Sequence, residues 1–130
     1  IARQESAFSV NANSSAGAKG LMQLISVTAR RLAIGADISL SETAEELYQP
    51  AINVELGSRL LRELSLGYKG INPRVYAAYN AGKFVVDRWV QSRDNKDLLL
   101  WVELIPFGET RRYVMNVWRN LLVYRWLAKV

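Results

Sequence analysis

The sequence contains no cysteine and no histidine among its 130 residues. The lack of cysteine excludes disulfide bonds and thiolate catalysis. The lack of both residues excludes Ser-His-Asp and Cys-His catalytic arrangements and the common zinc sites, which use imidazole or thiolate ligands. Acid–base chemistry near neutral pH must therefore come from Asp, Glu, Lys or Tyr, and a carboxyl group with a raised pKa suits that task best.

Long hydrophobic runs are also missing. The longest candidates, such as residues 97–102, are short and are soon interrupted by Glu103, whereas a helix that crosses a membrane needs about 20 apolar residues. We therefore expect no membrane span. The composition, 50% hydrophobic and 22% charged, is that of a globular protein, and 130 residues can enclose one hydrophobic core. Ile1 stands in what reads like the inside of a helix, without an initiator Met, so we expect a segment of a longer chain.

The charge balance is basic, with a net charge of +5 and a pI of about 9.7. Such a balance suits an anionic partner, which could be nucleic acid, a membrane surface or an acidic polymer such as a cell wall. It is equally compatible with a basic surface that only aids solubility. Because the Lys and Arg residues are scattered and never form a run of five, the sequence does not support a tail dedicated to nucleic acid.

The hydrophobic spacing predicts helices nearly throughout. Residues 9–20 have the Asn, Ser and Gly content of turns. Ile52, Leu56, Leu60 and Leu64 recur at intervals of four, as one buried helix face requires. We expect Ser26 and Asn72 to be N-caps and Ser39 with Glu42 to form a capping box. The predicted fold is all-α, one compact domain of about seven helices, with helical segments at 1–8, 26–35, 39–48, 50–67, 72–82, 84–91, 98–105 and 109–128.

Four short segments place polar residues among apolar or small neighbours, and they are the candidates for chemistry. They are residues 5–6, 20–23, 77–82 and 102–111.

Each polar residue in these segments also has a purely structural interpretation. Glu5 could be a solvated helix carboxylate, and Gln23 could be a buried amide with satisfied hydrogen bonds. Asn80 could end a helix ahead of a glycine, and Glu109 could be a first-turn helix acid. Glu103 lies between two apolar residues, where a carboxylate either finds a donor or stays protonated.

Taken together, RQESAFSVNANSSAGAKGLMQL (3–24), AYNAG (78–82) and VELIPFGETRRYV (102–114) resemble the catalytic domain of the soluble lytic transglycosylases of bacterial cell walls. These enzymes belong to the goose-type-lysozyme-like superfamily. The resemblance covers essentially the whole chain, with the motifs in the expected order. It implies a lysozyme-like α+β fold with little strand and a catalytic domain over residues 1–130 that forms the C-terminal part of a longer chain.

The resemblance implies that Glu5 is the sole catalytic acid. It would protonate the glycosidic oxygen between N-acetylmuramic acid and N-acetylglucosamine and then, as a carboxylate, take the proton of the muramoyl C6 hydroxyl. That hydroxyl would close onto the anomeric carbon and give a 1,6-anhydro sugar without consuming water. No second carboxylate acts as nucleophile in this pattern, and the sugar's own acetamido group would assist.

The resemblance also implies a set of substrate-binding residues. Tyr79 and Tyr113 would contact Glu5 or the sugar, Asn80 would bind the acetamido group or nearby backbone, and Glu103 would orient substrate or tune Glu5. The sequence departs from the family pattern at Ile25, which stands in place of a methionine, and at Ser26, which stands in place of a proline and could cap the helix itself. The full set is Ser14, Gln23, Ile25, Ala78, Tyr79, Asn80, Glu103 and Tyr113.

The resemblance further implies a peptidoglycan glycan strand as partner, no cofactor, no metal and no nucleic acid, and a monomer within a larger chain in the periplasm or cell envelope. Two other functions remain open on the same fold. One is a lysozyme-type hydrolase that uses water in place of the C6 hydroxyl. The other is a non-catalytic cell-wall-binding domain. Binding of nucleic acid through the basic charge is a weaker third possibility.

Overall fold

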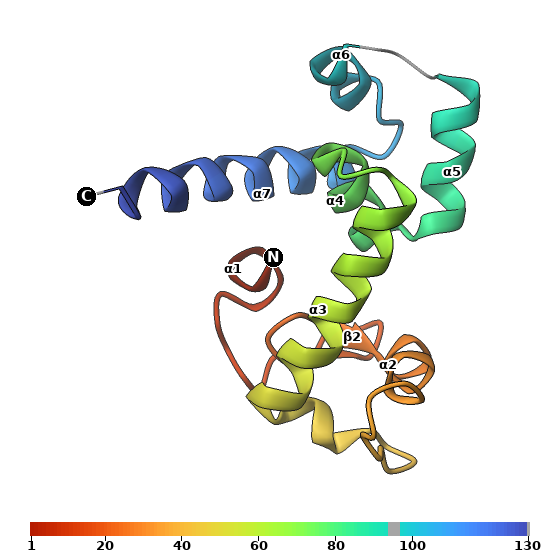
Figure 1. Ribbon diagram of the computed structural model, residues 1–130, viewed down its shortest axis with the longest axis vertical. Helices are drawn as coiled ribbons and strands as arrows, with labels where there is room; N and C mark the ends of the chain where they lie inside the picture. Colours follow the sequence, from red (N-terminus) through yellow and green to blue (C-terminus); the bar gives the residue numbers. More distant parts are fainter. Residues whose placement is uncertain (94–96, 130) are drawn as a thin grey trace. The chain divides into compact units, whose positions relative to one another are not determined.

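The computed structural model describes residues 1–93 and 97–129. The chain divides into two compact units, Ile1–Arg62 and Glu63–Val130, and each is described by itself. The division falls inside a helix, α3 (Pro50–Gly67), which runs from the first unit into the second (Figure 1). The sequence at this boundary does not have the composition of a linker, because the backbone there is part of one continuous helix.

The first unit combines short helices with a two-stranded sheet. The strands β1 (Ala18–Lys19) and β2 (Leu24–Ile25) pair antiparallel. The other elements are α1 (Ala2–Ser6), α2 (Ser26–Ala33), the 3₁₀ helix η1 (Glu45–Tyr48) and the first turns of α3. The remaining backbone of 9–23 makes turns, as its composition predicts.

The core of the first unit lies between α2, η1 and α3. Leu56 of α3 is fully buried there, and Ile52 and Leu60 pack partly against the same cluster. This arrangement confirms the predicted stripe along α3. The buried members of the cluster are Leu24, Ala29, Leu32, Ala33, Ala44, Leu47 and Leu56.

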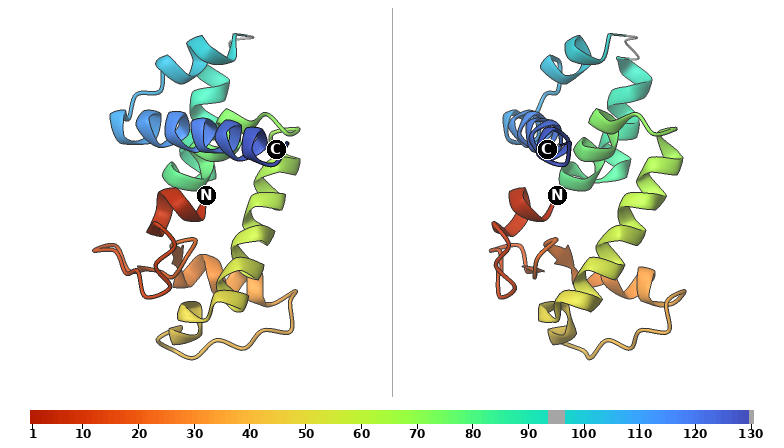
Figure 2. Two further views of the ribbon diagram at one scale, coloured as in Figure 1. Left: turned by 90° about the vertical axis from the view of Figure 1, so that its left-hand side faces the viewer. Right: turned by 60° about the vertical axis from the view of Figure 1, so that its left-hand side comes forward.

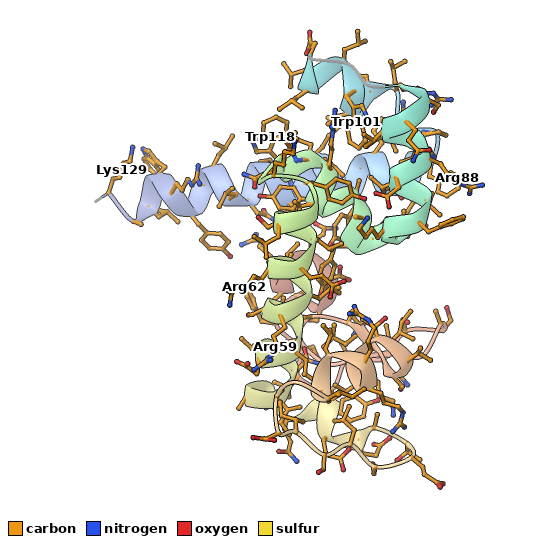
Figure 3. The ribbon with its side chains drawn as sticks, turned by 45° about the vertical axis from the view of Figure 1, so that its right-hand side comes forward. Arg59, Arg62, Arg88, Trp101, Trp118 and Lys129 are labelled. Carbon is orange, nitrogen blue, oxygen red and sulfur yellow. The ribbon has the colours of Figure 1, made fainter. Side chains whose placement is uncertain are left out.

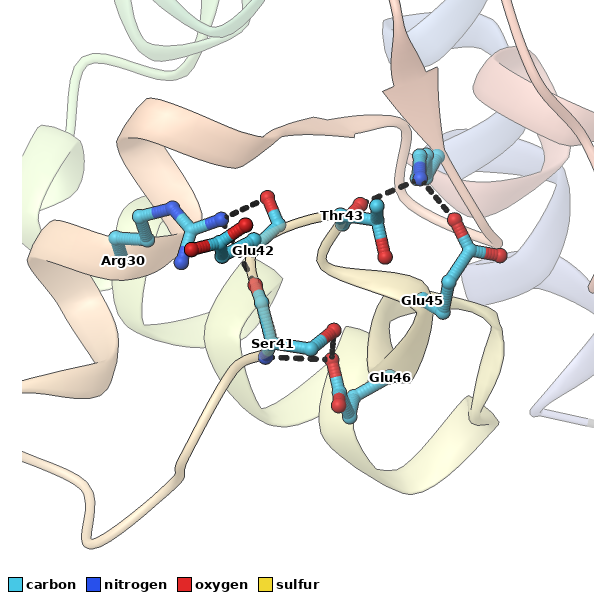
Figure 4. A network of polar contacts seen from close by, with 7 residues as sticks. Arg30, Ser41, Glu42, Thr43, Glu45 and Glu46 are labelled. Atoms are coloured by element: carbon cyan, nitrogen blue, oxygen red, sulfur yellow. Dashed lines mark hydrogen bonds and ion pairs between the residues drawn. The ribbon is translucent and has the colours of Figure 1, made fainter.

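Basic side chains fix the irregular segment between α2 and η1 (Figure 4). The Arg30 guanidinium donates to the carbonyl oxygens of three successive residues, 40–42. Lys19 Nζ donates to the carbonyl oxygen of Thr43 at 2.7 Å and to Glu45 Oε1 at 2.6 Å. These bonds satisfy carbonyl groups that no regular secondary structure pairs, which is how an irregular loop keeps one conformation.

The second unit is helical. It contains the end of α3 and the helices α4 (Asn72–Ala81), α5 (Lys83–Ser92), α6 (Leu98–Glu103) and α7 (Gly108–Leu127). Helix α4 packs against α5 and α7, and α6 packs against α7 (Figure 2). Trp101 of α6 is buried, with the Arg74 guanidinium 5.7 Å from its ring centre, whereas Arg88 points away from α5 (Figure 3).

The predicted fold class is confirmed, with seven α-helices and one small sheet in the described part of the chain. Three details of the helix starts were wrong. Ser26 and Asn72 are the first residues of their helices and make no side-chain cap bond. The capping box at Ser39 and Glu42 does not form. Instead the backbone N–H and hydroxyl of Ser41 both donate to Glu46 Oε2, at 3.1 and 2.9 Å.

The apolar face of α7 is buried only along its first half. Tyr113 and Val117 are buried, but Tyr124 and Leu127, which the spacing places on the same face, are exposed. Helical periodicity identifies which residues share a face and does not show how far along the helix a neighbour covers it. In the part of the chain that the structure describes, no helix is both long enough and apolar enough to cross a membrane.

Candidate active site

Glu5 lies in the last turn of the short helix α1 and is partly buried. The helix ends at Ala7, whose φ of 50° is left-handed and whose backbone N–H donates to the Arg3 carbonyl oxygen. Phe8 follows with φ 67° and is exposed. Two successive non-glycine residues in the left-handed region are uncommon and carry backbone strain, which is found most often at functional sites.

Ser6 fixes α1 to a loop much later in the sequence. Its hydroxyl lies 3.1 Å from the Ala2 carbonyl oxygen and 2.8 Å from the Leu21 carbonyl oxygen. The second contact joins the Glu5–Ser6 segment to the segment 20–23. Ser6 therefore sets the position of the turn that carries Glu5.

The segment 20–23 has a backbone that few residue types can adopt. Gly20 has φ 76°, and a Cβ at this position would overlap the Leu47 carbonyl oxygen and the Asn53 side chain. Only glycine satisfies both constraints.

Gln23 has φ 50° and is partly buried. Its Nε2 donates to the carbonyl oxygens of Ala12 at 3.1 Å and Gly20 at 2.9 Å. Because both partners are acceptors, the amide nitrogen must face them, and Oε1 faces the other way as an acceptor.

Asn53 of α3 supports this segment, and the sequence analysis missed it. The side chain is fully buried. Its Oδ1 accepts from the Met22 N–H at 2.7 Å, and its Nδ2 donates to the carbonyl oxygens of Lys19 at 2.9 Å and Leu47 at 2.8 Å. A signal was present, because Asn53 stands three residues before Leu56 and so shares the apolar face of α3.

Ser14 and Ile25 are the other predicted residues of the first unit. Ser14 lies in a tight turn, where its Oγ accepts from the Ala18 N–H at 3.1 Å and its own N–H donates to the Ala18 carbonyl oxygen. Ile25 ends β2 with its side chain 49% exposed. The structure thus gives Ser14 a turn-forming role and leaves Ile25 open to a ligand.

In the second unit, the predicted residues Ala78, Tyr79 and Asn80 lie in the last turn of α4, where Gly82 ends the helix with φ 88°. Ala78 is buried, and the other two are partly buried. Asn80 Oδ1 accepts a hydrogen bond of 2.7 Å from the Thr110 hydroxyl in the first turn of α7.

Tyr113 follows Thr110 by three residues on α7 and is also buried. Residues three apart lie on the same face of a helix. Thr110 and Tyr113, both within the motif 102–114, therefore lie on one face of α7. Thr110 joins that face to the end of α4 through its bond to Asn80.

Glu103 does not have the buried environment that its apolar neighbours suggest. It is the last residue of α6 and is exposed, so its carboxylate does not need a buried donor. Its main chain has a structural role, because the Arg111 guanidinium donates to the Glu103 carbonyl oxygen at 2.7 Å. Short apolar runs around a polar residue predict burial poorly where the helix ends.

A second polar cluster lies outside the predicted site, at the junction of α3 and α5. The Tyr68 hydroxyl donates to Asp87 Oδ1 at 2.8 Å, and Lys83 Nζ lies 2.6 Å from Asp87 Oδ2. Burial, together with the hydrogen bond to Asp87, raises the pKa of Tyr68. The hydrogen bond from Lys83 holds the pKa of Asp87 below its usual value, and the bond from Tyr68 acts in the same direction.

The predicted site residues are divided between the two units. Glu5, Ser14, Gln23 and Ile25 belong to the first, and Ala78, Tyr79, Asn80, Glu103 and Tyr113 to the second. Within residues 1–93 and 97–129, no group of three or more His, Cys, Asp or Glu side chains is placed to hold a metal ion. Among the predicted residues of the first unit, Glu5 is the one that carries a carboxyl group, and it lies in the turn that Ser6 joins to the segment 20–23.

Comparison with known proteins gives a match between residues 1–102 and the model of the transglycosylase SLT domain family. The chain belongs to this family. Its resemblance to that family, inferred from the motifs, is thereby confirmed. Similarity extends past the matched region, since named relatives align with nearly the whole chain.

Two relatives in the family show the extent of the similarity. A putative soluble lytic murein transglycosylase of Haemophilus influenzae is 44% identical over 119 residues, which are 90% of this chain and 20% of that protein. The soluble lytic murein transglycosylase of Escherichia coli K12 is 37% identical over 129 residues, 97% of this chain and 20% of that protein. The chain thus spans about a fifth of the length of these relatives.

Solved structures of similar proteins agree with the fold. An inactive glutamate-to-glutamine mutant of the lytic transglycosylase Slt from Pseudomonas aeruginosa matches with a TM-score of 0.80 and 41% identity, over 90% of this chain and 19% of that one. A 70 kDa soluble lytic transglycosylase in complex with bulgecin A matches with a TM-score of 0.91 and 36% identity, over 98% of this chain and 21% of that one.

Proposed function

We propose that this chain is a peptidoglycan lytic transglycosylase. It cleaves the β-1,4 bond between N-acetylmuramic acid and N-acetylglucosamine and leaves a 1,6-anhydromuramoyl product. The observation that carries the proposal is the placement of Glu5 on α1, fixed through Ser6 to the segment 20–23, in a chain of this family. Because the sequence contains no histidine and no cysteine, a carboxyl group is the natural proton donor.

In the proposed reaction, the protonated Glu5 carboxyl donates its proton to the glycosidic oxygen as the bond from that oxygen to the muramoyl anomeric carbon breaks. The muramoyl C6 hydroxyl oxygen then bonds to the anomeric carbon, and its proton passes to the Glu5 carboxylate. The carboxyl group is restored, and no water is consumed. This cycle requires the Glu5 carboxyl group to be protonated before the substrate is cleaved.

The other predicted residues bind the glycan strand in this proposal. Gln23 offers Oε1 as an acceptor for a sugar hydroxyl or N–H group, because its Nε2 is already held by two carbonyl oxygens. Asn80 offers Nδ2 as a donor, because its Oδ1 is already bonded to Thr110. The remaining contacts come from Ser14, Ile25, Ala78, Tyr79, Glu103 and Tyr113.

The test is the mass of the products released from purified sacculi. Anhydro-muropeptides are lighter by one water than the hydrolysed products. We expect the wild-type chain to release the anhydro form and Glu5→Gln to release none, while the matched control Glu55→Gln keeps full activity. Glu55 is an exposed acid whose pair with Arg59 is a surface salt bridge of small energy.

Each other outcome identifies an alternative. Release of only reducing-end muramic acid would show a lysozyme-type hydrolase. Binding of sacculi without any release would show a non-catalytic wall-binding domain. Equal release by wild type and Glu5→Gln would remove Glu5 from the proposed role.

We also propose that residues 1–130 act as the catalytic domain of a longer chain in the periplasm or cell envelope, since the relatives are about five times as long and are named for action on murein. Release of anhydro products by residues 1–130 alone would support an autonomous catalytic domain. Activity that appears only in a longer chain would contradict it.

A further inference from the structure

Thr110 is a buried polar residue to which no role has been assigned so far. Its side chain is 2% exposed. Threonine is mostly a surface residue, and a buried hydroxyl needs a partner. Here the hydroxyl lies 2.7 Å from Asn80 Oδ1 and donates to it. A threonine in a helix has two accessible χ1 rotamers, and the bond to Asn80 is formed in one of them.

In this bond the oxygen of the Asn80 amide faces α7, so the nitrogen faces away from it. The oxygen and nitrogen of an asparagine amide are nearly equal in size, so an amide without a directing partner can present either one. A hydroxyl can donate to Oδ1 or accept from Nδ2, and here it donates, so the oxygen lies toward α7 while this bond is formed. The nitrogen Nδ2, with its two hydrogens, then faces the opposite way as a donor.

We propose that Thr110 is a positioning residue for Asn80, whose amide it orients so that Nδ2 donates to a carbonyl oxygen of the substrate. The inference rests on the proposed function, in which Asn80 contacts the glycan strand. Thr110 itself touches no substrate. It acts through Asn80, and this explains why a buried threonine stands in the α7 motif one turn before Tyr113.

The expected effect follows from the energy of one neutral hydrogen bond. Thr110→Val keeps the shape of the side chain and removes the hydroxyl. Without that donor the Asn80 amide is free to rotate, and the substrate meets the correct orientation only part of the time. We expect kcat/KM for product release to fall roughly three- to tenfold. Thr110→Ser keeps the hydroxyl and should retain most of the wild-type rate.

The experiment compares Thr110→Val in two backgrounds, wild type and Asn80→Ala. If Thr110 acts through Asn80, the valine substitution lowers kcat/KM when Asn80 is present and has no further effect once Asn80 is alanine. An equal loss in both backgrounds would show that Thr110 only supports packing and would overturn the proposal. So would a Thr110→Val rate equal to wild type. Thermal unfolding of all variants confirms that they are folded at the assay temperature, and Thr110→Ala replaces valine if that variant is not.

The proposal can fail separately from the proposed function. If the wild-type chain releases hydrolysed product only, the same comparison is made with that rate. If it cleaves nothing, the variants are compared by their dissociation constants for the glycan strand, with the same three- to tenfold effect expected only when Asn80 is present. Absence of that pattern overturns the role of Thr110 whatever the reaction proves to be.

Discussion

The substitution Asn53→Leu tests how much the buried Asn53 amide contributes to stability through its bonds to the segment 20–23 and its neighbours. Leucine has the same branching and the same number of side-chain heavy atoms and suits the apolar face of α3, so the substitution removes hydrogen bonds and leaves no cavity. Its two methyl groups are bulkier than the amide, so any overpacking adds to the loss. Three backbone groups lose their partner: the Met22 N–H and the carbonyl oxygens of Lys19 and Leu47.

The magnitude follows from the burial of those groups. Leaving a buried backbone donor or acceptor unpaired costs about 1–3 kcal/mol. The bonds to Met22 and Leu47 are buried, whereas the bond to Lys19 is only partly buried, so water can replace it at smaller cost. Two full penalties and one partial penalty give a loss of roughly 2–7 kcal/mol in the free energy of unfolding. This is a large fraction of the 5–15 kcal/mol that is typical of a domain.

Urea unfolding followed by tryptophan fluorescence and circular dichroism measures this loss. Asn53→Asp is the matched variant, because its carboxylate can still accept from the Met22 N–H but offers no donor to the two carbonyl oxygens. It should also be destabilised, and less so at low pH, where the protonated acid can donate again. A loss below about 1 kcal/mol for Asn53→Leu would refute the reasoning, because it would mean that the three groups find other partners.

Two further predictions concern packing and pH. Gly57→Ala should cost about 1–2 kcal/mol in urea unfolding, because the new Cβ overlaps Met22 Sδ and overpacking outweighs the gain in helix propensity, whereas Gly67→Ala meets only ordinary contact and should be neutral or slightly stabilising. Asp87→Asn should lower stability near neutral pH. Because the pKa of Asp87 is lowered in the folded state, its contribution is present above about pH 4 and is lost as the pH falls further, so the wild type and the variant should converge in acid. A stability difference that stays constant down to pH 2 would contradict this assignment.

Much of the fold was predictable because helical periodicity shows which residues share a face of a helix. The stripe on α3 and the glycine that ends α4 both lie where the spacing places them. Helix caps were less predictable, because several nearby Ser, Asn and Glu residues compete for the same backbone groups. Ser41 bonds to Glu46 in a loop whose carbonyl oxygens also accept from Arg30, a residue of another element, and helix spacing does not indicate either contact.

The motif positions of the candidate site were predictable, but two residues that support them were not. Asn53 and Thr110 are both buried polar residues in helices, and each bonds to a motif residue or to its neighbours from a distant part of the chain. Residue spacing along one sequence shows which side chains lie close together within a helix. It does not record a hydrogen bond between α4 and α7.

Two motif residues of the first unit, Ser6 and Gln23, bond to main-chain carbonyl oxygens. Ser6 bonds to the Leu21 carbonyl, and Gln23 bonds to the carbonyls of Ala12 and Gly20. The motif therefore specifies a backbone conformation at least as much as a set of reactive groups. It follows that two functions that share this fold, transfer to the C6 hydroxyl and hydrolysis by water, can share these residues. In the proposed mechanism the two reactions would differ in whether water or the C6 hydroxyl is placed to react next to Glu5, and the mass of the products distinguishes them.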